Sequence, residues 1–346
     1  MDIPGQCRRQ AEWCENLGSP LYAALLRHVA DDYESHGPAH ALLAPHAADT
    51  PASALALRLM GAVHRLVLAG AAPELTPFYP SVGGRVGIEG AWKAFRVLLF
   101  LRRAELAPLL HSPVQTNDVG RSGTLLGGFL HSAVYFGKPL RLLEIGTSAG
   151  LNLLWDRYRY EWSHGQGWGP PDALVRLRNV FRNEPPQWPV RVDIVERAGC
   201  DLHPLDATSS SGQRTLLSYI WADQLTRIER LKAACDTARD EPVAVEQATA
   251  GEWLERKLAE RVSGATTVVF HSVVWQYLSL EERSRVEQLI RQAGAAAKEN
   301  APLVWLRMEP LETGLGAPVL RWQGFPGGED RTLATSSYHA PSVCWL

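Results

Sequence analysis

The stretch RLLEIGTSAGLN, residues 141–152, decides the fold of this chain, because an apolar run leads there into an acid and then a glycine loop. Residues 140–145 are short, apolar and bounded by a proline and a glycine, which predicts a fully buried strand of a parallel sheet. Gly146 and Gly150 permit backbone angles closed to other residues and carry no side chain that would hold a ligand away. We expect residues 151–160 to form a helix whose first N–H groups face that ligand.

The spacing of the glycines distinguishes between kinds of nucleotide-binding loop. A dinucleotide-binding loop reads Gly-x-Gly-x-x-Gly, and here Ser148 stands where the middle glycine would let the backbone approach a pyrophosphate. The pattern Glu-x-Gly-x-x-x-Gly is instead typical of class I methyltransferases that bind S-adenosylmethionine (SAM). A strand, a tight bend and a helix without any ligand is the alternative that this pattern leaves open.

Length and composition indicate an ordinary globular protein. With 346 residues the chain has room for about two domains, and a hydrophobic fraction of 46% allows a sizeable core. The formal net charge of -2 gives no general attraction to nucleic acid or anionic lipid. The first residues lack the order of a signal peptide and no apolar run is long enough to cross a membrane, so we expect a cytoplasmic protein.

Cysteine usage and composition also limit the partners. The five cysteines are odd in number, scattered and without Cys-x-x-Cys spacing. They are Cys7, Cys14, Cys200, Cys235 and Cys344. We therefore expect reduced thiols and no metal site. Among partners we expect a small-molecule substrate and neither nucleic acid nor membrane, and a homodimer stays open.

The first 115 residues are expected to form a helical domain. Apolar residues recur at helical spacing in three of its segments, residues 21–33, 54–69 and 90–110. Between the last two, residues 73–85 are rich in proline and glycine and contain two adjacent aromatic residues. This segment forms either a lid over a pocket or a simple connector.

The remaining residues, 116–346, predict an α/β domain, because strands and helices alternate there as in a parallel sheet covered on both faces. After the first strand, the expected strands are residues 190–202, 243–248, 266–274 and 303–308. Helices are expected at residues 125–136 and 213–238. Residues 161–189, rich in Trp, Pro and Gly, look like an insertion containing part of a hairpin, and residues 319–346 like a terminal hairpin.

Two polar positions outside the glycine loop each have a structural and a ligand-binding interpretation. In the polar segment before the helix at 125–136, Thr116 or Asn117 caps a helix, or else Asn117 and Arg121 reach a bound carboxylate. Asp201 ends the strand expected at residues 190–202. An acid at that strand tip either accepts hydrogen bonds from both hydroxyls of a ribose or caps its own loop.

Six segments spread over most of the chain carry a family resemblance. They are RLLEIGTSAGLNLLWDRYRY (141–160), TNDVGRSGT (116–124), GCDLHPLD (199–206), LSYIWADQ (217–224), HSVVWQY (271–277) and WLRMEP (305–310). Together they resemble the uncharacterised bacterial family called domain of unknown function 2332. Members of that family are similar to class I SAM-dependent methyltransferases, which implies a Rossmann-like sheet and SAM as the cofactor.

The resemblance also implies which residues surround that cofactor. It puts Glu144, Gly146 and Gly150 around the methionine end of SAM and Asp201 at its ribose. The third strand usually ends in an acid near the adenine, and here Gln247 or Thr249 stands in its place. The full set of expected cofactor-binding residues is Glu144, Gly146, Thr147, Ser148, Gly150, Asn152, Asp201, Asn117, Arg121 and Gln247.

The resemblance also implies the catalytic residues, because methyltransferases of this type place groups that face the substrate at the tip of the fourth strand. In this sequence they are His271, Trp275 and Tyr277. His271 has a side chain suited to accepting a proton from a hydroxyl or amine, or else it is a structural histidine. Trp275 and Tyr277 pack either on the sulfonium or a substrate ring, or in the core. At the end of the fifth strand, Arg307 and Glu309 either bind substrate or form a salt bridge with each other.

The leading hypothesis is a SAM-dependent methyltransferase with a helical amino-terminal domain, acting on a hydroxyl or amine of a small or medium-sized molecule. A rival is a regulatory module that keeps the SAM-binding fold without turnover. A nicotinamide-dependent oxidoreductase is disfavoured by the glycine spacing. The chain has no Walker or His-Glu-x-x-His motif, so P-loop and zinc-protease chemistry have no support.

Overall fold

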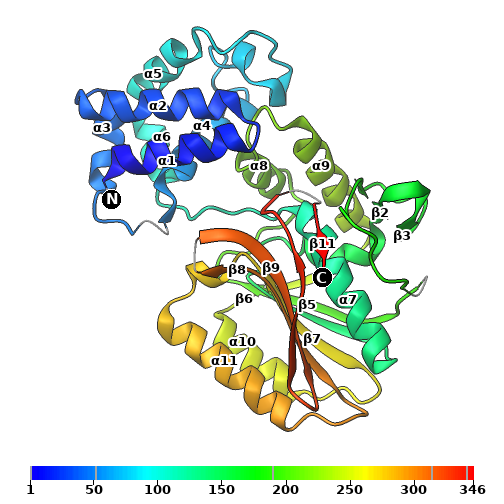
Figure 1. Cartoon of the computed structure of the whole chain (residues 1–346). Coiled ribbons are helices and arrows are strands. Elements are labelled where there is room, and N and C mark those ends of the chain that lie inside the picture. The colour runs from blue at the N-terminus through cyan, green and yellow to red at the C-terminus, as the bar shows by residue number, and fades with distance from the viewer. Residues whose placement is uncertain (1, 51–52, 189–190, 313–314, 340–341) are drawn as a thin grey trace. The chain divides into compact units, whose positions relative to one another are not determined.

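The computed structural model describes residues 2–50, 53–188, 191–312, 315–339 and 342–346 (Figure 1). It confirms the α/β class, with a large mixed sheet flanked by helices and a helical amino-terminal region. The chain divides into two units, of which the first joins Met1–Thr116 to Ser209–Glu229. The second joins Asn117–Thr208 to Arg230–Leu346.

The first unit is helical throughout its regular structure. Its helices are α1 (Ile3–Asn16), α2 (Pro20–Glu34), α3 (Pro38–Leu43), α4 (Leu55–Leu68), α5 (Ala91–Leu101), α6 (Arg103–Leu109) and α8 (Ser210–Ser218). Short 3-10 turns occur at η1 (Ala44–His46), η3 (Thr76–Phe78) and η4 (Pro80–Val82). The single helix expected at residues 90–110 is thus divided into α5 and α6 at Arg102.

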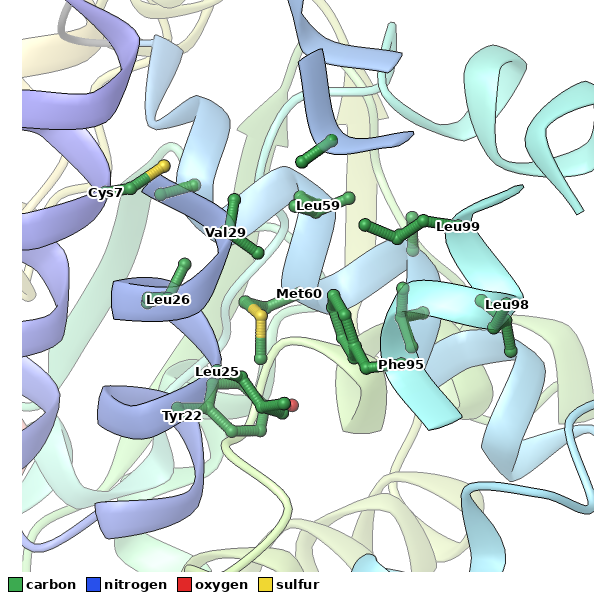
Figure 2. Close-up of a cluster of buried hydrophobic side chains, with 14 of the residues drawn as sticks. Cys7, Tyr22, Leu25, Leu26, Val29, Leu59, Met60, Phe95, Leu98 and Leu99 are labelled. Carbon is green, nitrogen blue, oxygen red and sulfur yellow. The ribbon is translucent and has the colours of Figure 1, made fainter. Parts of the chain in front are cut away.

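The apolar residues that recur at helical spacing in this unit share one core. Figure 2 shows side chains from α1, α2, α4 and α5 converging on one another, among them Leu26, Met60 and Phe95. All three side chains are completely buried. Because apolar residues at helical spacing fill one shared core, the pattern predicts each helix well.

The segment 209–229 lies in the first unit, whereas we expected it inside the α/β domain. Trp221 and Ala222 belong to the helical core. The Asp223 carboxylate accepts hydrogen bonds from the Ser19 hydroxyl at 2.5 Å and the Leu21 N–H at 3.1 Å. These contacts join residues some two hundred positions apart in sequence, so periodicity alone could not place the segment.

The prediction of a single long helix at residues 213–238 was wrong. The chain forms α8 and α9 (Leu225–Asp240), with a break over residues 219–224. Trp221, within this break, packs in the core of the first unit. The division between the two units falls inside α9, after Glu229.

The second unit is built around an eight-stranded sheet in the order β11-β10-β9-β8-β7-β1-β5-β6. The strands are β1 (Leu140–Ile145), β5 (Ile194–Asp201), β6 (Ala244–Gln247), β7 (Thr266–Ser272), β8 (Leu303–Glu312), β9 (Leu315–Phe325), β10 (Glu329–Thr335) and β11 (Cys344–Trp345). Strands β6, β5, β1, β7 and β8 are parallel, and β9 to β11 continue the sheet antiparallel. The order reverses direction between β1 and β7, so the switch point of the parallel part lies there.

Helices cover both faces of this sheet. The helices α10 (Ala250–Ala259) and α11 (Leu280–Ala295), yellow to orange in Figure 1, lie on one face, and α7 (Ser122–Phe136) lies on the other. Leu143 and Ile145 of β1 pack in the core under α10 and α11. Since successive strand residues point to opposite faces, Glu144 points toward the α7 face. On that face the ring of Phe270 meets Phe129 of α7 at 5.0 Å.

The prediction of a helix at residues 151–160 was wrong. Residues 151–157 form a kinked 3-10 helix, η6 (Leu151–Arg157), and the chain then enters β2 (Arg159–Glu161). The Tyr158 hydroxyl donates to the Leu151 carbonyl at 2.6 Å and the Tyr160 hydroxyl donates to the Trp155 carbonyl at 2.8 Å. These side-chain bonds occupy carbonyls that a continuing α-helix would use.

The insertion at 161–189 contributes to a small separate sheet in the order β3-β2-β4. Its other strands are β3 (Gly167–Trp168), antiparallel to β2, and β4 (Arg176–Leu177), parallel to β2. Further 3-10 turns are η5 (Val119–Arg121), η7 (Ser163–Gly165) and η8 (Trp275–Tyr277). At the other end of the chain, β9 and β10 form an antiparallel hairpin around Gly327 and Gly328, and it begins earlier than expected.

Three expectations from the sequence concern membrane-spanning helices, metal sites and cysteines. The described helices include none with the length and apolar character needed to span a bilayer. Within the same residues, no three or more His, Cys, Asp and Glu side chains gather as a metal would require. All five cysteines are free thiols. Val190, the first residue of the strand expected at 190–202, lies outside the described residues.

Candidate ligand-binding site

The connection after β1 lies at the carboxyl end of the sheet, at the switch point. Its backbone takes left-handed angles at Gly146 (φ 64°), Ser148 (φ 55°) and Gly150 (φ 75°). Glycine adopts such angles freely, but a serine held there costs ~1–3 kcal/mol and persists only where the surroundings impose it. Strain of this kind clusters at functional sites, so Ser148 marks this loop as a candidate.

Asp201 imposes that conformation from the tip of the neighbouring strand. One carboxylate oxygen accepts the N–H of Ser148 at 2.9 Å, and the other accepts the N–H of His203 at 2.8 Å. The expected tip position of Asp201 is therefore seen, together with the loop-capping bond that was its alternative role. A carboxylate oxygen has more than one lone pair, so these two bonds leave Asp201 able to accept from a ribose hydroxyl.

Asn117 holds the other end of the loop. Its side-chain oxygen accepts the N–H of Leu151 at 2.8 Å, across 34 positions of sequence. The role of capping the next turn falls instead to Asp118, which accepts the Gly120 N–H at 2.9 Å. Both Ser148 and Leu151 thus give their backbone donors to side chains of the protein.

Glu144 is the most strongly perturbed acid in this region. It is 2% exposed, and the Thr147 hydroxyl donates to it. Burial raises the pKa of its carboxyl to about 8, a rise that the Thr147 bond and the positive charge of Arg121 partly oppose and that Asp201 increases. Glu144 therefore holds a proton at neutral pH more readily than an ordinary glutamate does.

The raised pKa of Glu144 predicts a measurable pH dependence of stability. Because the folded protein binds this proton more tightly than the unfolded chain, the contribution is complete below the ordinary pKa of 4.5 and is lost as pH rises through about 8. Glutamine does not titrate, so Glu144→Gln should lack this loss of stability. Between pH 4.5 and about 8, the unfolding free energy of the wild type should therefore fall more steeply with pH than that of the variant.

Urea unfolding across that range provides the measurement. Glu255→Gln, which removes an exposed carboxylate on α10, serves as the control and should follow the wild type. Parallel curves for wild type and Glu144→Gln would show that the Glu144 carboxyl is not protonated in the folded state.

Arg121 is a buried cation at the switch point. It is 8% exposed, and one terminal nitrogen donates to the Ser272 carbonyl at the end of β7 at 2.9 Å. The described residues give its guanidinium no ion pair, and its Nε has no hydrogen-bond partner among them. Buried charges in proteins are normally paired, so this arrangement suits an anionic group supplied from outside.

Asn152 carries the second set of unsatisfied polar atoms. It lies in η6 directly after the glycine loop and is 1% exposed. Neither its amide nitrogen nor its amide oxygen has a partner within the described part of the chain. A buried amide with a donor and an acceptor both unused calls for a bound water or ligand.

His271, the expected catalytic base, has both ring nitrogens occupied. Its Nδ1 lies 2.7 Å from a Glu309 oxygen, and its Nε2 lies 3.2 Å from the Trp305 indole nitrogen. The indole can only donate, so Nε2 accepts and Nδ1 carries the proton given to Glu309. The side chain is 1% exposed and stacked on Trp275. In this arrangement no ring nitrogen is left to take a proton from a substrate.

The two expected aromatic residues beside it differ in exposure. Trp275 is partly buried and packs with His271 at a ring distance of 4.9 Å, whereas Tyr277 is 53% exposed. The suggested salt bridge between Arg307 and Glu309 was wrong. Arg307 pairs with Asp330 at 3.1 Å instead, because that carboxylate faces it from β10.

Gln247 and Thr249 have different positions and hydrogen bonds in the structure. Gln247 ends β6 beside Asp201, and its amide donates to the Leu202 carbonyl at 3.1 Å. Thr249 is the N-cap of α10, where its hydroxyl accepts the Glu252 N–H at 3.3 Å. Thr249 is thus committed to the helix, and Gln247 is the one of the two that lies at the strand tip.

At both loop glycines, neighbouring residues fill the space that a side chain would occupy. A Cβ added to Gly146 would lie 2.2 Å from the Val274 side chain, and one added to Gly150 would lie 2.4 Å from Val243. The expectation that these glycines leave bare main chain for a ligand was therefore wrong on the side where a Cβ would lie. There they permit close packing against neighbouring valines.

Gly146→Ala should accordingly destabilise the fold. A methyl group there meets Val274 and also keeps a left-handed backbone, so we expect a loss of ~2–4 kcal/mol in unfolding free energy. Gly137→Ala is the matched control, because its φ of 61° is nearly the same and an added Cβ meets nothing within 4 Å. Equal losses for the two variants in urea unfolding would show that the Val274 contact is not tight.

Sequence reasoning missed one feature of this region. Glu309 bonds to His271 across neighbouring strands, and its second oxygen is buried without a partner in the described residues. The register of β7 against β8, which pairs His271 with Arg307, brings the two residues together. Nothing in the order of the sequence reveals that register.

A comparison with protein-family models matches residues 5–345 to the family described as uncharacterized protein conserved in bacteria (DUF2332). The match covers nearly the whole chain, so the protein belongs to this family. No curated protein and no solved structure matches the chain.

Proposed function

We propose that this DUF2332 protein is a SAM-dependent methyltransferase acting on a small or medium-sized molecule. The strand order is one support. Five parallel strands in the order β6-β5-β1-β7-β8 repeat the 3-2-1-4-5 part of the doubly wound Rossmann sheet. Such sheets bind ligands beyond the carboxyl ends of their strands at the switch point. In this chain that position is occupied by the loop after β1.

The observation that carries the proposal is the buried guanidinium of Arg121, which forms no ion pair with any residue that the structure describes. Arg121 interacts electrostatically with Glu144, but burial raises the pKa of that carboxyl to about 8, which makes Glu144 a weaker counterion than an ordinary glutamate. A ligand that brings a carboxylate, as the methionine end of SAM does, would supply the missing partner. Asn152 offers a buried donor and acceptor to the same ligand.

The loop itself favours a ligand without phosphate. Dinucleotide-binding loops direct free backbone N–H groups at a pyrophosphate. Here the N–H groups of Ser148 and Leu151 already donate to Asp201 and Asn117. SAM has no phosphate, whereas NAD and NADP do, so the loop supports the first and disfavours an oxidoreductase.

The remaining expected residues have roles compatible with SAM. Asp201 and Gln247 lie side by side at the tips of β5 and β6, where ribose and adenine contacts are expected. SAM supplies an activated methyl group on a sulfonium. The protein then has to hold the acceptor in line and exclude water, and alignment of this kind is worth ~7–11 kcal/mol.

The second candidate is a regulatory module that binds SAM without transferring its methyl group. One observation favours it, since both nitrogens of His271 are occupied by Glu309 and Trp305. A proton acceptor is then needed elsewhere, or the protein does not turn over. Methyl transfer from radiolabelled SAM to any acceptor decides between the two.

Isothermal titration of the full chain tests the cofactor. Wild type should bind SAM and S-adenosylhomocysteine but not NADH. Arg121→Gln should weaken SAM binding by ~1.5–3 kcal/mol, because a charged hydrogen bond to a carboxylate is lost. Arg191→Gln, an exposed arginine, is the control and should bind like the wild type.

Two results would contradict the assignment. The first is wild-type protein that binds NADH and not SAM. The second is a folded Arg121→Gln variant, checked by circular dichroism, whose affinity for SAM stays within a factor of two of the wild type.

A further inference from the structure

The carboxyl group of Glu309 is satisfied on one oxygen only. Its Oε1 accepts from His271 Nδ1 at 2.7 Å, from the Val274 N–H at 3.0 Å and from the Trp275 N–H at 3.3 Å. Its Oε2 is buried and has no partner among the described residues. The residue as a whole is 9% exposed. One oxygen therefore has three donors while the other has none.

The neighbours of Glu309 fix this asymmetry. The Trp305 indole nitrogen lies 3.2 Å from Nε2 of His271, and the ring of Trp275 stacks on the imidazole with an interplanar angle of 14°. His271 consequently keeps its Nδ1 proton directed at Oε1 and cannot turn to serve the second oxygen. Leaving a buried carboxylate oxygen without a donor is costly, so the fold holds Oε2 ready for a donor that is not part of the described chain.

Aromatic side chains accompany this carboxyl group. Trp275 follows directly on the loop that Glu309 holds, and Tyr277, in the same turn, is largely exposed. Burial raises the pKa of the Tyr338 phenol, and the nearby Glu309 and Tyr277 add to that rise. A carboxylate among such rings is the combination that binds organic cations, since aromatic faces attract positive charge. We call Glu309, Trp275, Tyr277 and Tyr338 the Glu309 cluster.

We propose that the Glu309 cluster binds a protonated primary or secondary amine, with an N–H of the ammonium donating to Oε2 and its carbon chain against the aromatic rings. A hydroxyl compound would bring a single weak donor and no charge, so the cluster favours the amine. The assignment deepens the proposed function in one respect, because it names an amine as the methyl acceptor.

The corresponding transfer balances without a further reactant. Glu309 Oε2 takes one proton from the bound ammonium and leaves a lone pair on its nitrogen. That pair forms the new N–C bond as the S–C bond breaks, and the electron pair of the broken bond stays on sulfur, which becomes a thioether. The product is the methylated ammonium. His271 acts here as a positioning residue, because it orients Glu309 without touching the amine.

Two probes that differ only in the reacting group test the binding. Phenethylammonium chloride and 2-phenylethanol are titrated into the full chain and followed by isothermal titration. The wild type should bind the ammonium at least tenfold more tightly than the alcohol. Glu309→Gln should lose at least tenfold in ammonium affinity, because the neutral amide keeps an acceptor for Val274 but removes the charge. Glu329→Gln, at the first residue of β10, should change nothing.

A second variant keeps the test independent of any folding defect at Glu309. Trp275→Leu retains the backbone N–H that Glu309 accepts and removes only the ring, so it should weaken ammonium binding several-fold. Equal affinity for the two probes, or a folded Glu309→Gln that binds the ammonium within a factor of two of the wild type, would overturn the assignment.

Titration of SAM on the same proteins separates this inference from the proposed function. Glu309→Gln should bind SAM like the wild type. Wild-type protein that binds the ammonium but not SAM would overturn the methyltransferase and leave the amine site standing. Protein that binds SAM but shows no preference for the ammonium would overturn the amine site alone.

Discussion

The hydrogen bond from the Ser148 N–H to Asp201 is the interaction on which the candidate site depends. It ties the tip of β5 to the loop after β1 and holds a serine in a left-handed conformation. Together with the bond from Leu151 to Asn117, it uses the backbone donors that a phosphate would otherwise need. The same interaction therefore shapes the loop and narrows the class of ligand that it can accept.

Two unsatisfied groups of opposite charge then define the chemistry at the carboxyl edge of the sheet. Arg121 is a buried cation next to β1 and β7, and Glu309 offers a buried acceptor at the end of β8. Strand alternation puts Glu144 on the α7 face and His271 on the face of α10 and α11. Arg121 donates to the Ser272 carbonyl and Glu309 accepts the N–H of Val274, two residues further on, so a carboxylate bound at one and an amine bound at the other would lie near each other.

Much of the fold could be predicted because its signals are local. The apolar run of β1, the acid at the tip of β5 and the helical periodicity of α4 each lie within one short segment. What the sequence could not give depends on distant partners. Trp221 breaks an expected helix by packing in the helical unit, and Tyr158 and Tyr160 turn another into a 3-10 helix. The bond of Glu309 to His271 arises from strand register, so the sequence alone does not predict that both ring nitrogens of His271 are occupied.

The most direct test of the central claim is a crystal structure of the full chain with S-adenosylhomocysteine bound. The account predicts that the ribose hydroxyls lie within hydrogen-bond distance of the Asp201 carboxylate and that the ligand carboxylate contacts Arg121. The loop after β1 should keep its bonds to Asp201 and Asn117. A ligand bound elsewhere, with Arg121 contacted by water alone, would contradict the account.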